Sequence, residues 1–142
     1  MSNRRSLTVN DLINDNVKLN RAAFAAVREF RRSKPWRGTF EERLEKFMKL
    51  TTALGEAYGV QGLELIFQGE ESLMSLGDGK YDPKTNRIIL VRKLSVVTLL
   101  HCMAAARGYT ARERFAWSLS VFKKMFPISF SRCHAVGIFL VR

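Results

Sequence analysis

A short apolar run followed at once by a capped apolar helix restricts the fold of this chain more than any other feature. Arg87-Ile-Ile-Leu-Val91 is rich in β-branched residues and is typical of a strand. Ser95 can cap a helix that continues to about Arg107 and stops at Gly108. A strand and an apolar helix this close in sequence bury their apolar surfaces together. We therefore predict an α+β fold in which this helix lies against a sheet that ends in the apolar run.

Two further segments predict the rest of the sheet. Residues 63–67 form a short, mostly apolar run, and Lys80-Tyr81 precedes the turn-rich sequence Asp82-Pro-Lys-Thr-Asn86. Such a turn between two short runs is typical of a hairpin. The three runs together predict a small three-stranded antiparallel sheet with packed helices.

Start and stop signals predict the other helices. Thr39-x-x-Glu42 has capping-box spacing before a helix over about 40–58, and Thr110-x-x-Glu113 repeats that spacing before a helix that Pro127 ends. Residues 8–32 have helical spacing of apolar residues and predict one N-terminal helix. The tail, residues 130–142, is expected to finish as an extended segment.

The aromatic residues of the last predicted helix point to core packing. Phe115, Leu119, Phe122 and Phe126 lie three or four residues apart and form one stripe, whereas Trp117 lies off it. This stripe should pack on the 96–107 helix. Lys123 and Lys124 should then face outward, with Arg112 and Arg114 near the start of the helix.

The composition suits one buried core. The chain has 142 residues, of which 46% are hydrophobic. We divide it into residues 1–38, an N-terminal helix with a basic connector, and residues 39–142, an α+β domain. No apolar run reaches the roughly 18 to 20 residues that span a bilayer, and the start lacks the apolar stretch of a signal peptide. We expect a soluble cytoplasmic protein without a membrane partner.

Positive charge concentrates toward the two ends of the chain. The formal net charge is +11, and residues 80–142 hold 12 basic and 2 acidic residues, whereas residues 47–79 hold 1 basic and 5 acidic ones. Such an excess favours a polyanionic partner, because each phosphate that Lys or Arg neutralises releases condensed counterions. The expected partner is DNA, RNA or an acidic protein; the alternative is that the charge serves solubility alone.

The candidate nucleic-acid-binding residues fall in two groups. The first is the stretch from Arg28 to Gly38, the end of the N-terminal helix and the basic connector, where Pro35 ends the helix and a tryptophan stands among cations. The second is the cationic surface of the last helix. The candidates are Arg28, Arg31, Arg32, Lys34, Trp36, Arg37, Arg112, Arg114, Lys123 and Lys124.

The order of helix, strands, Tyr-Asp-Pro hairpin, apolar strand and helix resembles small zincin metallopeptidases of the gluzincin, SprT-like or ImmA/IrrE-like kind. In these families the last helix carries L-H-E-x-x-H-x-x-G, whose histidines bind zinc and whose glutamate activates water. The pattern falls on Leu100, His101, Cys102, Ala105 and Gly108. Cys102 stands where the glutamate would be, and Ala105 stands where the second histidine would be. The resemblance thus implies a zincin-like fold without the catalytic residues.

We accordingly expect no catalytic residue and no metal or other cofactor, with His101 and Glu113 as vestiges of a zinc site. Glu113 would be the third ligand by resemblance, but its spacing from Thr110 indicates a helix cap. His101 is expected to be half-buried and hydrogen-bonded. A makeshift zinc site from His101, Cys102, Cys133 and His134 is disfavoured because helix neighbours point about 100° apart. A Cys133–His134 nucleophile pair is disfavoured because adjacent residues rarely face one substrate atom.

Three functions are compatible with these features. The first is a non-hydrolytic pseudo-metallopeptidase that acts as a basic binding or regulatory module, most directly toward nucleic acid. The second is an active metal-dependent peptidase with a non-standard zinc site. The third is a subunit of a larger assembly that docks through its arginine-rich arm.

Overall fold

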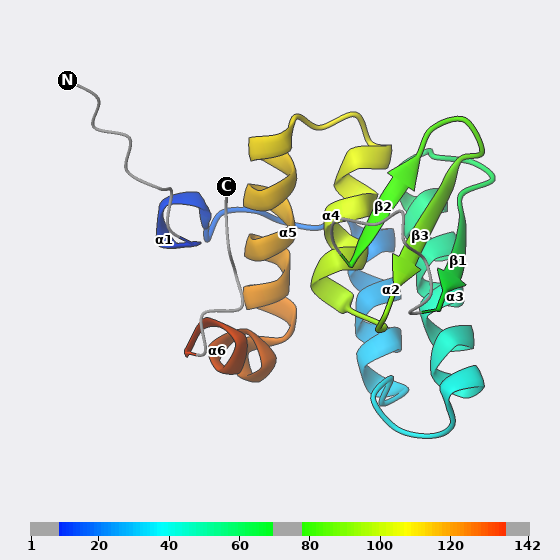
Figure 1. Ribbon diagram of the computed structural model, residues 1–142. Coiled ribbons are helices and arrows are strands. Elements are labelled where there is room, and N and C mark those ends of the chain that lie inside the picture. Colours follow the sequence, from blue (N-terminus) through cyan, green and yellow to red (C-terminus); the bar gives the residue numbers. More distant parts are fainter. Residues whose placement is uncertain (1–8, 70–77, 136–142) are drawn as a thin grey trace.

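The computed structural model describes residues 9–69 and 78–135. In chain order, Figure 1 shows short helix α1 (Val9–Leu12), α2 (Arg21–Arg32) and α3 (Phe40–Ala57), then three strands, then α4 (Val96–Ala106), α5 (Ala111–Met125) and α6 (Pro127–Ala135). The strands are β1 (Glu64–Gln68), β2 (Gly79–Asp82) and β3 (Arg87–Val91). The prediction of an α+β fold with a small three-stranded sheet is therefore confirmed.

The single N-terminal helix predicted over residues 8–32 is wrong, because the chain forms α1 and α2 with an irregular segment between them. The side chain of Asn14 accepts a hydrogen bond from the backbone N–H of Asn16 at 2.9 Å. Asn20 then caps α2 by accepting from the N–H of Ala23 at 2.8 Å. Asparagine competes with helical hydrogen bonding in this way, and these local bonds divide the helix.

The predicted antiparallel sheet is wrong for one of its two pairings. β2 pairs with β3 antiparallel, but β1 pairs with β3 in parallel, so the sheet is mixed and its order is β1-β3-β2. The three strands do alternate in direction along the chain; the error concerns which strand lies in the middle. β3 has four consecutive buried residues, while β1 and β2 carry charged residues such as Glu64 and Lys80. The most apolar strand takes the central position, where both of its edges are covered.

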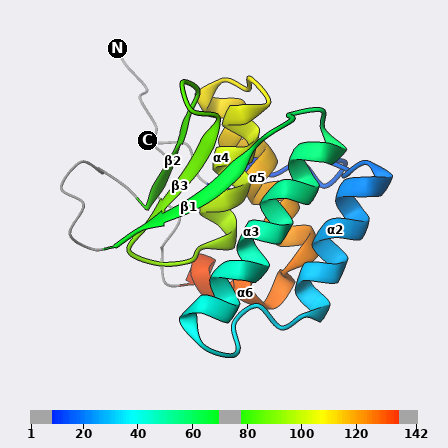
Figure 2. The same cartoon turned by 90° about the vertical axis from the view of Figure 1, so that its right-hand side faces the viewer.

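The helices pack around this sheet as layers. α3 packs against β1, α4 packs against β2 and β3, and α5 packs against α4. Figure 2 shows α2 beside α3, with α5 behind them. The prediction that the helix over 96–107 lies against the sheet, with the next helix across it, is confirmed. The largest fully buried side chains include Leu54, Ile88, Leu90, Leu99, Leu100 and Met103.

The core also includes α2. Ala23, Val27 and Phe30 are buried and belong to the same apolar cluster as residues of α3, α4 and α5. The ring of Phe30 makes an edge-to-face contact with Phe47 of α3, with ring centroids 5.0 Å apart. The division of the chain into residues 1–38 and 39–142 stays a prediction. The apolar core contains residues from both sides of this boundary.

α5 is buried on more of its surface than one stripe. Trp117, which lies off the predicted stripe, is also buried and is only 6% exposed. Its ring packs edge-to-face against Tyr58 and Tyr109, and the guanidinium of Arg107 lies 5.5 Å from its centroid. Neighbours on several sides bury this helix, so its own periodicity shows only part of the packing.

Pro127 separates two helices instead of ending the regular structure. α5 ends at Met125 and α6 begins at Pro127, a position where proline is tolerated because the first helical N–H has no partner in the helix. The first part of the tail, residues 130–135, is helical, and the extended segment is predicted for the residues that follow it. Residues 136–142 of that prediction lie outside the described residues.

Candidate nucleic-acid interface

The exposed side of α2 carries a stripe of arginines. Arg21, Arg28 and Arg32 line a shallow hollow together with Phe24, whose side chain is 45% exposed. Positions i, i+7 and i+11 fall on one side of a helix, and the opposite side of α2 is buried in the core. Glu29 also borders the hollow, but its carboxylate lies 3.4 Å from Nζ of Lys49 on α3. We call these three arginines the α2 arginine stripe.

Arg31 is also on α2, but it does not belong to this stripe and makes a structural contact with another helix. Its Nη1 donates a hydrogen bond to the carbonyl oxygen of Met125 at 3.0 Å, at the C-terminal end of α5. A cation at that end satisfies an unpaired carbonyl and favours the helix dipole. Arg31 therefore joins α2 to α5.

The connector is exposed except at one residue. Pro35 is buried, whereas Lys34, Trp36 and Arg37 are exposed, and Trp36 is 59% exposed. The backbone turns sharply because Lys34 has a φ of 54° and its carbonyl accepts from the N–H of Arg37 at 3.0 Å. The connector thus presents an indole ring and two cations within five residues of the last arginine of the stripe.

The four cations predicted on the last helix divide between its two ends. Lys123 lies 3.6 Å from the carboxylate of Asp15, and Lys124 donates to the carbonyl of Val17 at 3.1 Å. Both lysines are exposed, as predicted. Arg112 and Arg114 lie at the other end of α5, roughly 13 Å or more away at 1.5 Å of helix rise per residue. The structure therefore does not bring all ten candidates onto one site.

Arg114 also has a local role. Its Nε donates to the carbonyl of Tyr109 at 2.8 Å, and its side chain is half-buried. Arg112 is exposed at the first turn of α5. This end of α5 supplies one exposed cation, compared with the three arginines of the α2 stripe.

His101 lies half-buried on α4, as predicted, but it is not hydrogen-bonded through Nδ1, which is buried without a partner. Its ring centroid is 4.5 Å from that of Phe115 on α5. Burial lowers the pKa of His101 below its usual 6.5, and the positive charge of Arg114 lowers it further. The imidazole is therefore neutral at pH 7 and faces an aromatic ring.

The residues beside His101 offer no catalytic group. Cys102 is buried, and burial raises the pKa of its thiol to about 12, so the thiol stays protonated at neutral pH. Ala105 has no atom that can bind a metal. Cys133 and His134 fall in α6, and their side chains lie outside the described part of the chain.

Glu113 forms the predicted capping box. The N–H of Thr110 donates to its Oε1 at 2.9 Å, and the N–H of Glu113 donates to Oγ1 of Thr110 at 3.3 Å. The hydrogen bond from the backbone N–H of Thr110 to the carboxylate lowers the pKa of Glu113, and the side chain of Thr110 lowers it further. Across residues 9–69 and 78–135, no cluster of three or more His, Cys, Asp or Glu side chains could hold a metal ion.

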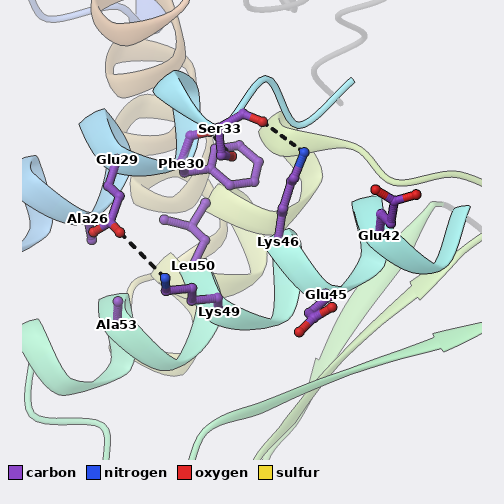
Figure 3. Close-up of a pocket in the computed structure, with 10 residues that line it drawn as sticks. All are labelled: Ala26, Glu29, Phe30, Ser33, Glu42, Glu45, Lys46, Lys49, Leu50 and Ala53. Carbon is purple, nitrogen blue, oxygen red and sulfur yellow. Dashed lines mark hydrogen bonds and ion pairs between the residues drawn. The ribbon is translucent and has the colours of Figure 1, made fainter. Parts of the chain in front are cut away.

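A cleft of about 370 Å³ lies between α2 and α3 (Figure 3). Its apolar floor includes Phe30 and Leu50, and charged side chains form its rim. Nζ of Lys46 donates to the carbonyl of Ser33 at 2.8 Å, and Lys49 is paired with Glu29. The remaining rim charges include Glu42 and Glu45, so the cleft is unsuited to a phosphate.

Comparison with family models, with curated proteins and with solved structures found no match for this chain. Within the described ranges, no helix combines the length and apolar character needed to cross a membrane.

Sequence reasoning missed three cations: Arg21, which borders the hollow on α2, and Arg43 and Lys93, which border a separate cleft beside the connector. Arg21 was detectable, since it lies seven residues before Arg28, a spacing that returns to the same side of a helix. Arg43 and Lys93 come from separate elements, α3 and the β3–α4 junction. Only the packing of those elements brings the two residues together.

Proposed function

We propose that this protein is a non-hydrolytic nucleic-acid-binding module with a zincin-like scaffold. The observation that carries the proposal is the α2 arginine stripe, where three arginines and an exposed phenylalanine share one hollow. Guanidinium groups on one rigid helix suit a row of phosphates, and an exposed ring suits contact with sugar or base. The basic connector extends this surface beyond the end of the helix.

The zincin-like part of the proposal is supported by the position of His101. The histidine lies on the helix that directly follows the central strand, next to the helix that would hold a third ligand. Phe115 contacts its ring there, Ala105 lies one turn on, and Glu113 is engaged as a cap. A catalytic zinc ion needs about three protein ligands and an open position. The surroundings of His101 therefore support a zincin-like scaffold that does not catalyse peptide hydrolysis.

Binding should be electrostatic and largely independent of sequence. The α2 stripe offers cations for phosphates but no recognisable base-reading motif accompanies it in the sequence. Affinity for duplex DNA should fall with salt, with a log–log slope of about −0.9 for each phosphate neutralised.

The test is a fluorescence-anisotropy titration of a labelled DNA duplex at two or more salt concentrations. The triple variant Arg21→Gln/Arg28→Gln/Arg32→Gln should weaken binding to all sequences equally and make the salt slope shallower by about 3, since each lost phosphate contact changes it by about 1. Lys84→Gln, which removes one exposed charge from the turn between β2 and β3, is the control and should change the slope little. An unchanged slope in the triple variant would reject the α2 stripe as the interface.

A further inference from the structure

A second cleft, of about 360 Å³, lies where the connector meets α3 and the start of α4. Trp36 comes from the connector, Arg43 from α3, and Lys93 from the β3–α4 junction. Val97 and Phe126 supply apolar lining. None of the described side chains that line it is acidic, in contrast to the cleft between α2 and α3. The cleft thus combines an exposed aromatic ring with two cations.

Arg43 has an unused hydrogen-bond donor at this cleft. Its Nε is buried and has no hydrogen-bond partner. A guanidinium remains charged at all physiological pH values, so its donors gain most from an anionic acceptor. A buried donor without a partner costs free energy that a ligand oxygen would recover. Arg43 is therefore the group in this cleft with the most to gain from a bound anion.

Lys93 and the start of α4 add positive potential. Lys93 has one ion-pair partner in the described structure, Asp78, at 3.7 Å with both side chains partly exposed. Such a pair is weak and can exchange for a stronger anion. Val96 and Val97, in the first turn of α4, also line the cleft, so the positive end of the helix dipole opens on it.

Trp36 is the aromatic component. Its indole is 59% exposed although the preceding Pro35 is buried, so the connector is anchored while the ring stays accessible. An accessible indole on an anchored backbone can stack on a nucleobase, since every base presents a flat π-face. Arg32 of the α2 stripe lies only four residues earlier in the chain. A strand held on the stripe therefore has a short path to this ring.

We propose that this cleft binds one nucleotide, with the base stacked on Trp36 and the phosphate between Arg43 and Lys93. The inference rests on the proposed nucleic-acid-binding function and adds a preference for unpaired nucleotides. A base within a duplex is stacked on its neighbours and cannot reach the indole, whereas a base of a single strand can. The nucleotide is part of a single strand or is free, and both sources share this chemistry.

The test uses the full chain and follows its tryptophan fluorescence. The probes are an unlabelled oligothymidylate, a duplex of equal length, and thymidine monophosphate. The single strand should quench the emission, because Trp36 is exposed and Trp117 is only 6% exposed. Trp36→Phe should keep most of the affinity but lose the quenching. Trp36→Ala should lower single-strand affinity by roughly 5- to 150-fold, equivalent to about 1 to 3 kcal/mol for one stacked base, and leave duplex affinity unchanged.

Two further variants test the phosphate contact. Arg43→Met keeps the length of the side chain and should weaken single-strand binding about tenfold or more, since a hydrogen bond to a charged group contributes about 1.5 to 3 kcal/mol. Lys93→Gln should weaken single-strand binding less. Because Lys93 is exposed, this variant tests the phosphate contact even if Arg43→Met fails to fold. Lys84→Met, in the turn between β2 and β3, is the control and should leave single-strand binding unchanged. If thymidine monophosphate displaces the strand, a free nucleotide is sufficient to fill the cleft. If only the strand quenches the emission, the cleft binds a nucleotide as part of a longer chain.

The outcomes separate the two proposals. Duplex binding through the α2 stripe, with no quenching by single strands and no effect of Arg43→Met, would overturn the nucleotide cleft and leave the proposed function intact. Absence of binding to every probe at low salt would overturn both.

Discussion

At the scale of single residues, the structure separates cations with structural contacts from cations available to a partner. Arg31, Arg114 and Lys124 each donate to a backbone carbonyl, so these side chains stabilise the fold as well as adding positive charge to the surface. Arg28 and Arg32 lie in the exposed hollow on α2. Substitution of Arg31, Arg114 or Lys124 would lower stability and binding together, so the two effects could not be separated. The α2 stripe therefore gives the cleaner test of function.

His101 is the residue for which pH should matter most. Its folded-state pKa lies below 6.5 because of burial and of Arg114, so the unfolded chain binds a proton more readily than the folded chain. As pH falls through 6.5, protonation therefore favours unfolding, and this loss of stability levels off below the folded-state pKa. The free energy of unfolding should be lower at pH 5.5 than at pH 7.5. Urea titrations at both pH values measure the difference.

In His101→Leu this difference should shrink, because the titrating group is gone. His134→Leu, which removes the other histidine of the chain, measures how much of the difference belongs to that residue. Equal pH dependence in the parent chain and in His101→Leu would contradict the assignment. The carboxylates with lowered pKa values, Asp82 and Glu113, lose their stabilising charge only at more acidic pH.

At the scale of elements, local signals placed most helix ends correctly. Both predicted capping boxes, at Thr39 and Thr110, form with their reciprocal hydrogen bonds. Ser95 caps α4 by accepting from the N–H of Thr98 at 3.3 Å. These interactions lie within four residues of sequence, so they are visible without the tertiary structure.

The cap of α5 predicts a specific loss of stability. Thr110→Ala should lower the free energy of unfolding by about 0.5 to 2 kcal/mol, since the N–H of Glu113 then loses its acceptor at the helix start. Thr110→Ser keeps the hydroxyl and should retain most of the stability. Denaturant unfolding at neutral pH measures both. Equal losses in the alanine and serine variants would show that the methyl group, not the hydrogen bond, carries the effect.

At the scale of the whole molecule, folding brings the basic beginning and the basic end of the chain together. Arg31 contacts Met125, Lys123 lies next to Asp15, and the acidic middle of the sequence builds α3 and the first strands. Arg31, Lys123 and Lys124 thus lie around the C-terminal end of α5, whereas Arg112 and Arg114 lie at its other end. A polyanion can therefore meet cations from both regions.

The side chains of the described part of the chain predict that no metal is retained. Protein purified without a histidine tag should contain far less than one zinc per chain by elemental analysis, because His101 is the one predicted zinc-site residue that still offers a ligand atom at its position in the motif. His101→Ala should change neither the zinc content nor peptidase assays. One equivalent of zinc that disappears in His101→Ala would instead support the alternative, a peptidase with a non-standard site.

The sequence by itself determined the class of fold and most of the helices, because caps, apolar periodicity and turn residues act over a few neighbouring positions. Only the tertiary structure decided that β3 lies between β1 and β2, that Trp117 is buried, and that Arg43 and Lys93 share a cleft with Trp36. Each of these features depends on contacts between segments far apart in sequence. Strand order follows from which strand has the most apolar surface to cover, and a cleft exists only where three separate elements meet.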